Sequence, residues 1–315
     1  MDIIGIGTSC VDFLIHVKSL PKPNEGTRIM AYSLQGGGKV PTALVAAARL
    51  GARCGMVGIV GDCNYGQFCI EDYKYHDIDV TRFLVDQNSE TPFSCVLSEE
   101  ATHGRNILYH PSNVRLLTVK DLDKEYISSA QYLHLSDTNE VTQQAAKWVR
   151  EKNGTIVYDA DHYQSHIENF IPMIDIFVAS EFYYNTVFSD KNYEANLMSI
   201  FKMGPRIVVF TLGEIGCVGM DIDGFFFEPG FKVDVVDTTG AGDVYHGAFI
   251  YGLLQGWSVQ KTARFSNAVS AIKCTRIGGR AGIPDLSTVQ KFLDTGFIDY
   301  RKIDERVKRY QRRGL

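Results

Sequence analysis

The sequence predicts an α/β protein: a three-layer sandwich with a mostly parallel central sheet, to which a small β-sheet lid is added. Short apolar runs rich in β-branched residues alternate with segments of helical periodicity, the pattern of a parallel sheet covered by helices on both faces. Two other segments, 16–34 and 91–110, alternate apolar and polar residues without an intervening helix. The chain has 315 residues, of which 45% are hydrophobic and 22% charged, enough for a substantial globular core.

The predicted strands of the main sheet are short and apolar, as expected for strands buried on both faces. In chain order they are Ile3–Ile6, Cys54–Val60, Tyr132–Leu135, Thr155–Tyr158, Ile176–Val178 and Ile207–Thr211, with a further strand at Lys232–Val236. Helices are predicted at Pro41–Leu50, Gln67–His76, Thr142–Lys152, Tyr193–Lys202 and Tyr245–Gln255. The first helix opens with proline and stops at Gly51, which are the expected start and stop signals.

The lid is predicted from residues 13–35 and 91–112. Phe93–His110 is typical of a hairpin whose turn lies near Ala101–Gly104. Because no repeat, linker or low-complexity run divides the chain, we expect a single domain, 1–315, with the lid as a subdomain. The exposed strand edges of such a lid can pair between two chains, which favours a homodimer.

Charge and cysteine usage indicate a cytoplasmic protein that binds neither nucleic acid nor membranes. The net charge is −5, and the seven cysteines form no CxxC pair, which suits a reducing compartment. No apolar run approaches the ~18 residues of a membrane span, and the amino terminus lacks the basic region of a signal peptide. The basic tail, 299–315, carries Ile303, Val307 and Tyr310 at helical spacing. This tail is predicted to form a largely solvated helix that docks through one apolar stripe. A patch that binds nucleic acid is the alternative.

The run VVDTTGAGDVYHGA, Val235–Ala248, places glycines between a predicted strand and a predicted helix. At such a turn the amide groups of Ala241, Gly242 and Asp243 lack helical partners, and together with the helix dipole they form an anion site suited to phosphate. Gly240 and Gly242 let a phosphate approach the backbone because no Cβ obstructs it.

Asp243 follows this turn, and a carboxylate does not by itself hold a phosphate. It suits a general base that takes the proton of a hydroxyl attacking that phosphate, with the helix dipole favouring its ionised form. Phosphoryl transfer is mostly positioning and electrostatics, so such a site needs little beyond Mg²⁺. Read alone, the acid is also consistent with a helix cap beside a glycine turn.

Several distant segments, taken together, resemble the ribokinase-like (PfkB) carbohydrate kinases. They are DTTGAGD at Asp237–Asp243, QGGGKVPTALVAAARLGA at Gln35–Ala52, GIVGDCNYG at Gly58–Gly66, TLGEIG at Thr211–Gly216 and RFSNAVSAIKCTRIGGRAGIP at Arg264–Pro284. These segments keep the family's order and spacing over nearly the whole chain. The resemblance implies a Rossmann-like sheet with a β lid, and an ATP-dependent sugar kinase that uses Mg²⁺.

The resemblance also implies roles for individual residues. Asp243 is the expected base, and Gly240, Ala241 and Gly242 the expected anion hole. Asp12, Gly37, Gly38, Lys39 and Thr42 are expected at the sugar, although Asp12 is also consistent with a strand-end cap. Thr211, Gly213, Gly216 and Asn267 are expected to line the ATP pocket with Gly240 and Gly242. Asp237 and the carbonyl of Thr239 match positions that hold a monovalent cation such as K⁺ in many members, with a cage closed by the loop near Gly278–Gly282.

This chain departs from the family pattern at two points. Where many members have an NxxE motif for the Mg²⁺ water shell, it has Ser180–Glu181–Phe182–Tyr183, so Glu181 either substitutes or is a surface acid. Thr42 replaces the asparagine usual near the end of the glycine motif. Both departures bear on metal and substrate geometry rather than on the class of reaction.

The substrate is expected to be a ketose or ketose derivative. The segments around Asp237 and Gly278 look closest to the sulfofructose kinase and ketohexokinase branch. Arg28, Lys39 and Arg105 are available for an anionic group on the sugar. Tyr109 and Asn139 stand where the sulfofructose-specific members carry other residues, so an anionic group is left open.

Other classes of function fit less well. IIGIGTSC lacks the third glycine and the helix of a dinucleotide fingerprint, and the chain has no GxxxxGK[ST]. Asp159–His162 is consistent with a metal site or with the polar rim of a pocket. Two alternatives remain. One is a nucleoside kinase of the same fold, with the lid aromatics Phe13, Tyr32, Phe93 and Tyr109 available to stack on a base; the other is a sugar-binding regulator without catalysis.

Overall fold

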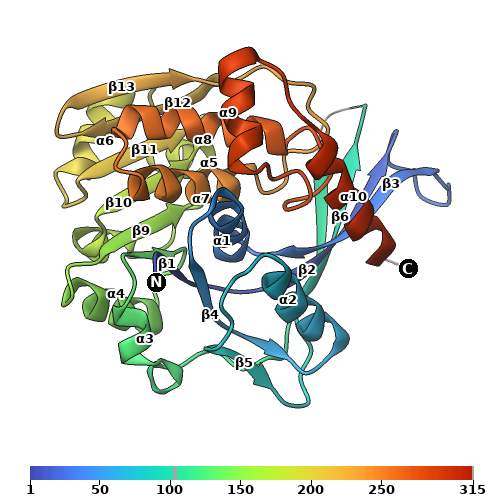
Figure 1. Ribbon diagram of the computed structural model, residues 1–315, viewed down its shortest axis with the longest axis horizontal. Helices are drawn as coiled ribbons and strands as arrows, with labels where there is room; N and C mark the ends of the chain where they lie inside the picture. Colours follow the sequence, from blue (N-terminus) through green and yellow to red (C-terminus); the bar gives the residue numbers. More distant parts are fainter. Residues whose placement is uncertain (102–104, 314–315) are drawn as a thin grey trace.

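In the computed structural model, which describes residues 1–101 and 105–313, a large sheet runs through the body and a small sheet stands beside it (Figure 1). The large sheet has nine strands in the order β13-β12-β11-β10-β9-β8-β1-β4-β5. Its strands are β1 (Ile3–Ile6), β4 (Cys54–Gly61), β5 (Phe83–Asp86), β8 (Tyr132–Leu135), β9 (Thr155–Ala160), β10 (Ile176–Ser180), β11 (Ile207–Thr211), β12 (Gly216–Asp221) and β13 (Gly224–Pro229). Neighbouring strands of this sheet are parallel except in the β11–β12 and β12–β13 pairs, which are antiparallel.

Helices cover both faces of the large sheet, as the alternation of strands and helices predicts (Figure 1). One face packs against α1 (Lys39–Leu50), α2 (Asn64–Tyr75), α7 (Ala241–Leu254), α8 (Val259–Lys273) and α9 (Leu286–Thr295), and the other against α3 (Lys124–Ser128), α4 (Glu140–Arg150), α5 (Glu181–Val187) and α6 (Tyr193–Phe201). Within β1, Ile3 belongs to the first core and Ile4 to the second, both fully buried, because successive strand residues face opposite sides. The predicted three-layer α/β fold is confirmed.

The small sheet has the order β3-β2-β6-β7 and combines the two predicted lid segments. Its strands are β2 (Cys10–Val17), β3 (Ile29–Gly37), β6 (Phe93–Glu99) and β7 (Arg105–His110). β6 and β7 form the predicted antiparallel hairpin, and β2 pairs with β6 in parallel. The predicted turn near Ala101–Gly104 lies mostly outside the described residues. In Figure 1 this sheet stands at one side of the helices, next to α10 (Arg301–Arg313).

Two local predictions around the glycine turn are wrong. Lys232–Val236 is not a strand: the amides of Val236 and Asp237 both donate to the carbonyl of Cys274 rather than to a neighbouring strand. The helix predicted from Tyr245 begins at Ala241, so Asp243 lies within its first turn.

The carboxyl-terminal helix docks as its apolar stripe predicts. Ile303 and Tyr310 of α10 are fully buried and Val307 is packed against the same core. Among the described helices, none combines the length and the apolar character needed to cross a membrane.

Candidate active site

The start of α7 forms a tight turn with two unused amide groups. Gly240, the N-cap, has a φ of 73°, and a Cβ there would lie 2.9 Å from the Cα of Gly279, so glycine is required on both counts. The amide of Ala241 donates to the carbonyl of Thr238 at 3.1 Å. Within the described part of the chain, the amides of Gly242 and Asp243 have no acceptor. The donors available to an anion are therefore those of Gly242 and Asp243.

A pocket of about 230 Å³ opens directly beside this turn. It brings together the residues expected around ATP with the exception of Gly240, which does not line it. Its lining includes Thr211, Gly213, Gly216, Asn267, Ala241 and Gly242. A Cβ on Gly242 would meet nothing within 4 Å, so open space lies in front of its unused amide.

Asn267 shapes this pocket through the backbone around it. Its amide group donates to the carbonyls of Glu228 and Pro229, both at 3.1 Å, and so ties α8 to the end of β13. Thr211 ends β11, and its hydroxyl donates to the carbonyl of Ala179 at 3.4 Å. Gly213 and Gly216 both have positive φ values, 59° and 112°, which let the chain turn tightly at the pocket wall.

Asp243 lies half-buried among charged groups at the carboxyl edge of the sheet. Burial and the nearby carboxylates of Asp159 and Asp161 raise the pKa of Asp243 well above its usual range, while Lys39 opposes them. Lys39, the first residue of α1, forms an ion pair with Asp161 at 3.0 Å. The helix dipole favours the ionised form of Asp243, whereas burial and the neighbouring carboxylates oppose it.

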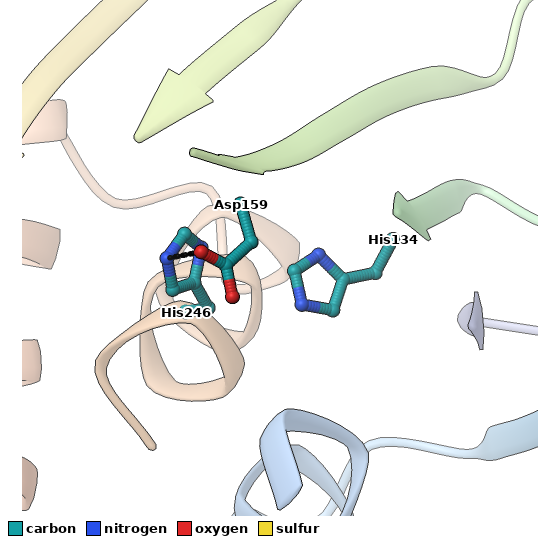
Figure 2. Close-up of side chains that lie close together, drawn as sticks. All are labelled: His134, Asp159 and His246. Atoms are coloured by element: carbon teal, nitrogen blue, oxygen red, sulfur yellow. Dashed lines mark ion pairs between the residues drawn. The ribbon is translucent and has the colours of Figure 1, made fainter. Parts of the chain in front are cut away.

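A buried polar cluster lies one helical turn beyond Asp243. Figure 2 shows the carboxylate of Asp159 between the rings of His134 and His246, with His246 Nε2 3.3 Å from the carboxylate. Their possible ligand atoms lie within 4.8 Å of one another, and all three side chains are buried. Burial lowers the pKa of His134 to about 3, so its ring is neutral beside the ion pair. The run 159–162 is thus divided: Asp159 joins this cluster, whereas Asp161 contacts Lys39 and His162.

Asp12 lies in a row of residues across the inner face of the small sheet. Gln35, Asp12, Ser94 and Tyr109 are directly opposite one another on β3, β2, β6 and β7. The hydroxyl of Ser94 donates to Asp12 at 2.5 Å, and burial raises the pKa of Asp12. A Cβ on Gly37 would lie 2.3 Å from the Asp12 carboxylate, so glycine is needed there. Tyr109, at the end of the row, is 79% exposed.

The glycine motif is held from behind by a buried arginine. Arg280 is fully buried, forms an ion pair with Asp72 at 2.7 Å and donates to the carbonyl of Gly37 at 2.9 Å. Its Nε donates to the hydroxyl of Thr42 at 3.4 Å, so Thr42 is directed toward the arginine. A cavity of about 220 Å³ lies on the other side of the motif. Its lining comprises Thr8, Cys10, Gly38, Lys39, Val40, Ser136 and Asp137.

Three further predicted residues, Arg28, Glu181 and Arg105, line neither of these two pockets. Arg28 precedes β3 at the far end of the small sheet, and along β2 the strand positions of Asp12 and Val17 are roughly 16 Å apart. Glu181 is exposed at the start of α5, where β10 ends. Arg105, at the start of β7, reaches back to donate to the hydroxyl of Thr238 at 3.0 Å, which joins the small sheet to the glycine turn.

The segments expected around a monovalent cation lie together, and the side chain of Lys273 lies between them. The carboxylate of Asp237 accepts from the amides of Thr239 and Gly278, both at 2.8 Å. The ammonium group of Lys273 donates to the carbonyl of Asp237 at 2.9 Å and to the carbonyl of Thr239. Burial would raise the pKa of Asp237, but Lys273 and the two amides lower it overall.

A comparison with known protein families covers most of the chain. Residues 2–286 match the pfkB family of carbohydrate kinases. The chain belongs to this family. As a pfkB-family carbohydrate kinase it is an ATP-dependent phosphotransferase that acts on a small-molecule sugar. It is similar to the 5-dehydro-2-deoxygluconokinase of Geobacillus kaustophilus, with 26% identity over 93% of this chain and 94% of that protein. The closer resemblance to the sulfofructose kinase and ketohexokinase branch stays unconfirmed.

Solved structures of similar kinases share the fold of this pfkB-family member. A ribokinase from Thermotoga maritima has 26% identity and a TM-score of 0.81, covering 94% of this chain and all of that one. A putative ribokinase II from Escherichia coli, solved in complex with ATP and Mg²⁺, has 19% identity and a TM-score of 0.82, covering 93% and 99% of the two chains. The ribokinase-like fold is thereby confirmed.

Several residues of this carbohydrate kinase's site were missed from the sequence. Ser94 and Asp137 carry no motif of their own, and Arg280 lies within the Arg264–Pro284 segment but has no role that the sequence indicates, because its position depends on contacts between distant segments. Lys273 has a weak signal, since a lysine within the apolar stripe of a helix must find acceptors when it is buried.

Proposed function

We propose that this kinase transfers the γ-phosphate of ATP to a hydroxyl group of a ketose or ketose derivative. The observation that carries the proposal is the position of Asp243. It follows directly after the unused amide of Gly242 in the wall of the pocket described above, and it lies close to Lys39, which lines the second cavity. A phosphate at the amides and a sugar in the second cavity would meet at this carboxylate.

Asp243 is proposed as the general base. The sugar hydroxyl oxygen attacks the γ-phosphorus, its proton passes to the Asp243 carboxylate, and the bond from phosphorus to the bridging oxygen breaks to release ADP. A raised pKa strengthens Asp243 as a proton acceptor while leaving it ionised at pH values above that pKa.

The Gly240–Gly242 turn is proposed as the anion hole. The free amides of Gly242 and Asp243, at the positive end of the α7 dipole, would stabilise charge on the transferred phosphoryl group. Gly240 contributes the left-handed turn, and the amide of Ala241 is already used within it.

The residues near the phosphate site fit a Mg²⁺·ATP complex. Carboxylates are the oxygen ligands that Mg²⁺ prefers, and Glu181 and Asp161 lie at the same edge of the sheet. When bound, Mg²⁺ neutralises phosphate charge. We assign Glu181 to its water shell, at the position where the family's NxxE motif is altered.

The sugar is proposed to lie against Asp12, Gly37, Gly38 and Lys39. A carboxylate accepts two hydroxyl donors, as a polyol demands, and the Asp12 carboxylate lies 3.6 Å from the Sγ of Cys10, which lines the second cavity. Tyr109 would close over the sugar from the edge of the small sheet, which acts as the lid. Thr42 contributes through Arg280, and Arg28 lies too far along the sheet to contact the same molecule.

The relatives' name, 5-dehydro-2-deoxygluconokinase, denotes a kinase for a keto derivative of a sugar acid. We propose a substrate of that class, with Lys39 or Arg105 near its carboxylate. A kinase assay across ketoses, aldoses, keto sugar acids, sulfonated sugars and nucleosides tests this. The keto sugar acids are expected to give the highest kcat/KM. A nucleoside or an aldose that exceeded every ketose derivative would contradict the substrate class.

The outer face of the small sheet supports a homodimer. Leu108 and Tyr32 are 62% and 38% exposed, and β7 is exposed along its whole length at the sheet edge. Sedimentation should show a dimer that Leu108→Glu converts to a monomer. Ile222→Glu, at an 89% exposed position in the β12–β13 turn, is the matched control and should leave the dimer intact. A wild-type monomer would contradict the proposal.

The thiols support the proposed cytoplasmic location. All seven cysteines are free, as expected in a reducing compartment.

A further inference from the structure

The loop cage around Asp237 has the donor set of a monovalent cation site. Backbone carbonyls of Asp237 and Thr239 point to one place, and the Asp237 carboxylate is fixed beside it by two amides. Carbonyl oxygens of this kind replace the hydration shell of an ion such as K⁺. The resemblance to the family implies such an ion at this position. Whether this chain needs one depends on which group lies against the two carbonyls.

In this chain the cage is taken by the side chain of Lys273. Its ammonium group donates to both carbonyls, and the residue is fully buried at the end of α8. A second cation in contact with the same two oxygens would meet both the volume and the like charge of the ammonium group, away from solvent screening. The residues present therefore do not fit a bound K⁺.

We propose that Lys273 is a tethered replacement for the monovalent cation, so that the protein neither needs nor binds K⁺ at this position. The lysine does the positioning that an ion would do: it holds the 237–239 segment against α8. One turn earlier on α8, Ser270 donates to the carbonyl of Ala241 at 2.9 Å. Ser270 and Lys273 thus bind backbone carbonyls on either side of Gly240. By fixing this turn, Lys273 acts as a positioning residue for the amides of Gly242 and Asp243.

The first test compares wild-type protein in K⁺ and in tetramethylammonium at equal ionic strength. Thermal unfolding is measured without substrate, and kcat/KM is measured with the best sugar. We expect the Tm to be unchanged and kcat/KM to change less than twofold. A saturable, more than twofold activation by K⁺, or a rise in Tm specific to K⁺, would overturn the inference.

The second test removes the tether. Lys273→Ala is expected to lower the Tm and to lower kcat/KM at least tenfold in tetramethylammonium, and K⁺ should then restore part of both. Lys261→Met, at an exposed position on the same helix, is the control and should behave as wild type. A folded Lys273→Ala variant that is as active as wild type, or that gains nothing from K⁺, would contradict the proposal that the Lys273 ammonium group takes the place of the cation. If this variant does not fold, the wild-type comparison alone decides.

The catalytic part of this inference rests on the proposed function, and the unfolding part does not. If no sugar were phosphorylated, the proposed function would fail while the Tm comparison still tested Lys273. If the enzyme were active but required K⁺, the inference about Lys273 would fail while the proposed function stood.

Discussion

At the scale of single residues, the proposed mechanism depends on the environment of Asp243. The dipole of α7 favours its ionised form, whereas burial and the carboxylates of Asp159 and Asp161 raise its pKa. The motif identifies Asp243 from the sequence because the chemistry requires an acid after the glycine turn. The sign of its pKa shift could not be predicted, because Asp159 and Lys39 reach it from separate elements.

Two substitutions should move the acid limb of the kcat–pH profile in opposite directions. In the proposed mechanism activity requires ionised Asp243, so it should fall as the pH drops through the raised pKa of this group. Asp159→Asn removes a negative neighbour, so the limb should move to lower pH; Lys39→Met removes a positive one, so it should move to higher pH. Asp294→Asn, exposed on α9, is the control. Shifts in the same direction, or none, would show that Asp243 does not set this limb.

At the scale of elements, most boundaries could be predicted because they depend on local pattern. The apolar runs and helical segments lie where the sequence places them, to within a few residues. The strand predicted at Lys232–Val236 is wrong because two of its valines, Val233 and Val235, line the pocket beside the glycine turn rather than pack against a neighbouring strand. The helix start at Ala241 was missed because glycines in a first turn look like loop.

The first turn of α7 gives a separable test of fold and function. Gly242→Ala should fold at least as well as wild type, because the new Cβ meets nothing within 4 Å and alanine favours the helix. The same Cβ enters the proposed phosphate space, so kcat/KM for ATP should fall roughly tenfold or more.

Unlike Gly242→Ala, Gly240→Ala should make the folded protein less stable. Its φ of 73° is left-handed, so unfolding free energy should fall by about 1–2 kcal/mol. Chemical denaturation and ATP kinetics measure both variants. Full ATP activity in Gly242→Ala would refute the phosphate position.

At the scale of the whole molecule, long-range buried charges join the lid, the glycine motif and the carboxyl-terminal helix. Arg280 contacts Asp72, 208 positions away, and Tyr310 donates to the same carboxylate at 2.8 Å. His76 joins this network through a hydrogen bond of 2.8 Å between its Nε2 and the hydroxyl of Tyr310. A sequence pattern indicates that α10 docks, but it cannot show that docking supports the motif at Gly37, because that depends on three segments meeting in one place.

Buried neutral histidines make the molecule sensitive to acid. The pKa of His134 is about 3 when folded and 6.5 as a free side chain, so the unfolded chain binds an extra proton between these values. The neutral ring of buried His134 therefore costs no stability above pH 6.5. As the pH falls from 6.5 toward 3, the free energy of unfolding decreases by up to about 1.4 kcal/mol per pH unit. Denaturation across this range should show a smaller slope for His134→Asn. His162→Asn, at an exposed position, should leave the slope unchanged.

The account depends most on Asp243 as the base, and the kcat of Asp243→Asn tests it directly. Asparagine keeps the size of the side chain and cannot accept the hydroxyl proton. With the best sugar and saturating Mg²⁺·ATP, kcat should fall at least about a hundredfold, while the Tm and the KM for sugar stay close to wild type. A variant that folds normally and keeps more than about a tenth of the wild-type kcat would contradict the assignment.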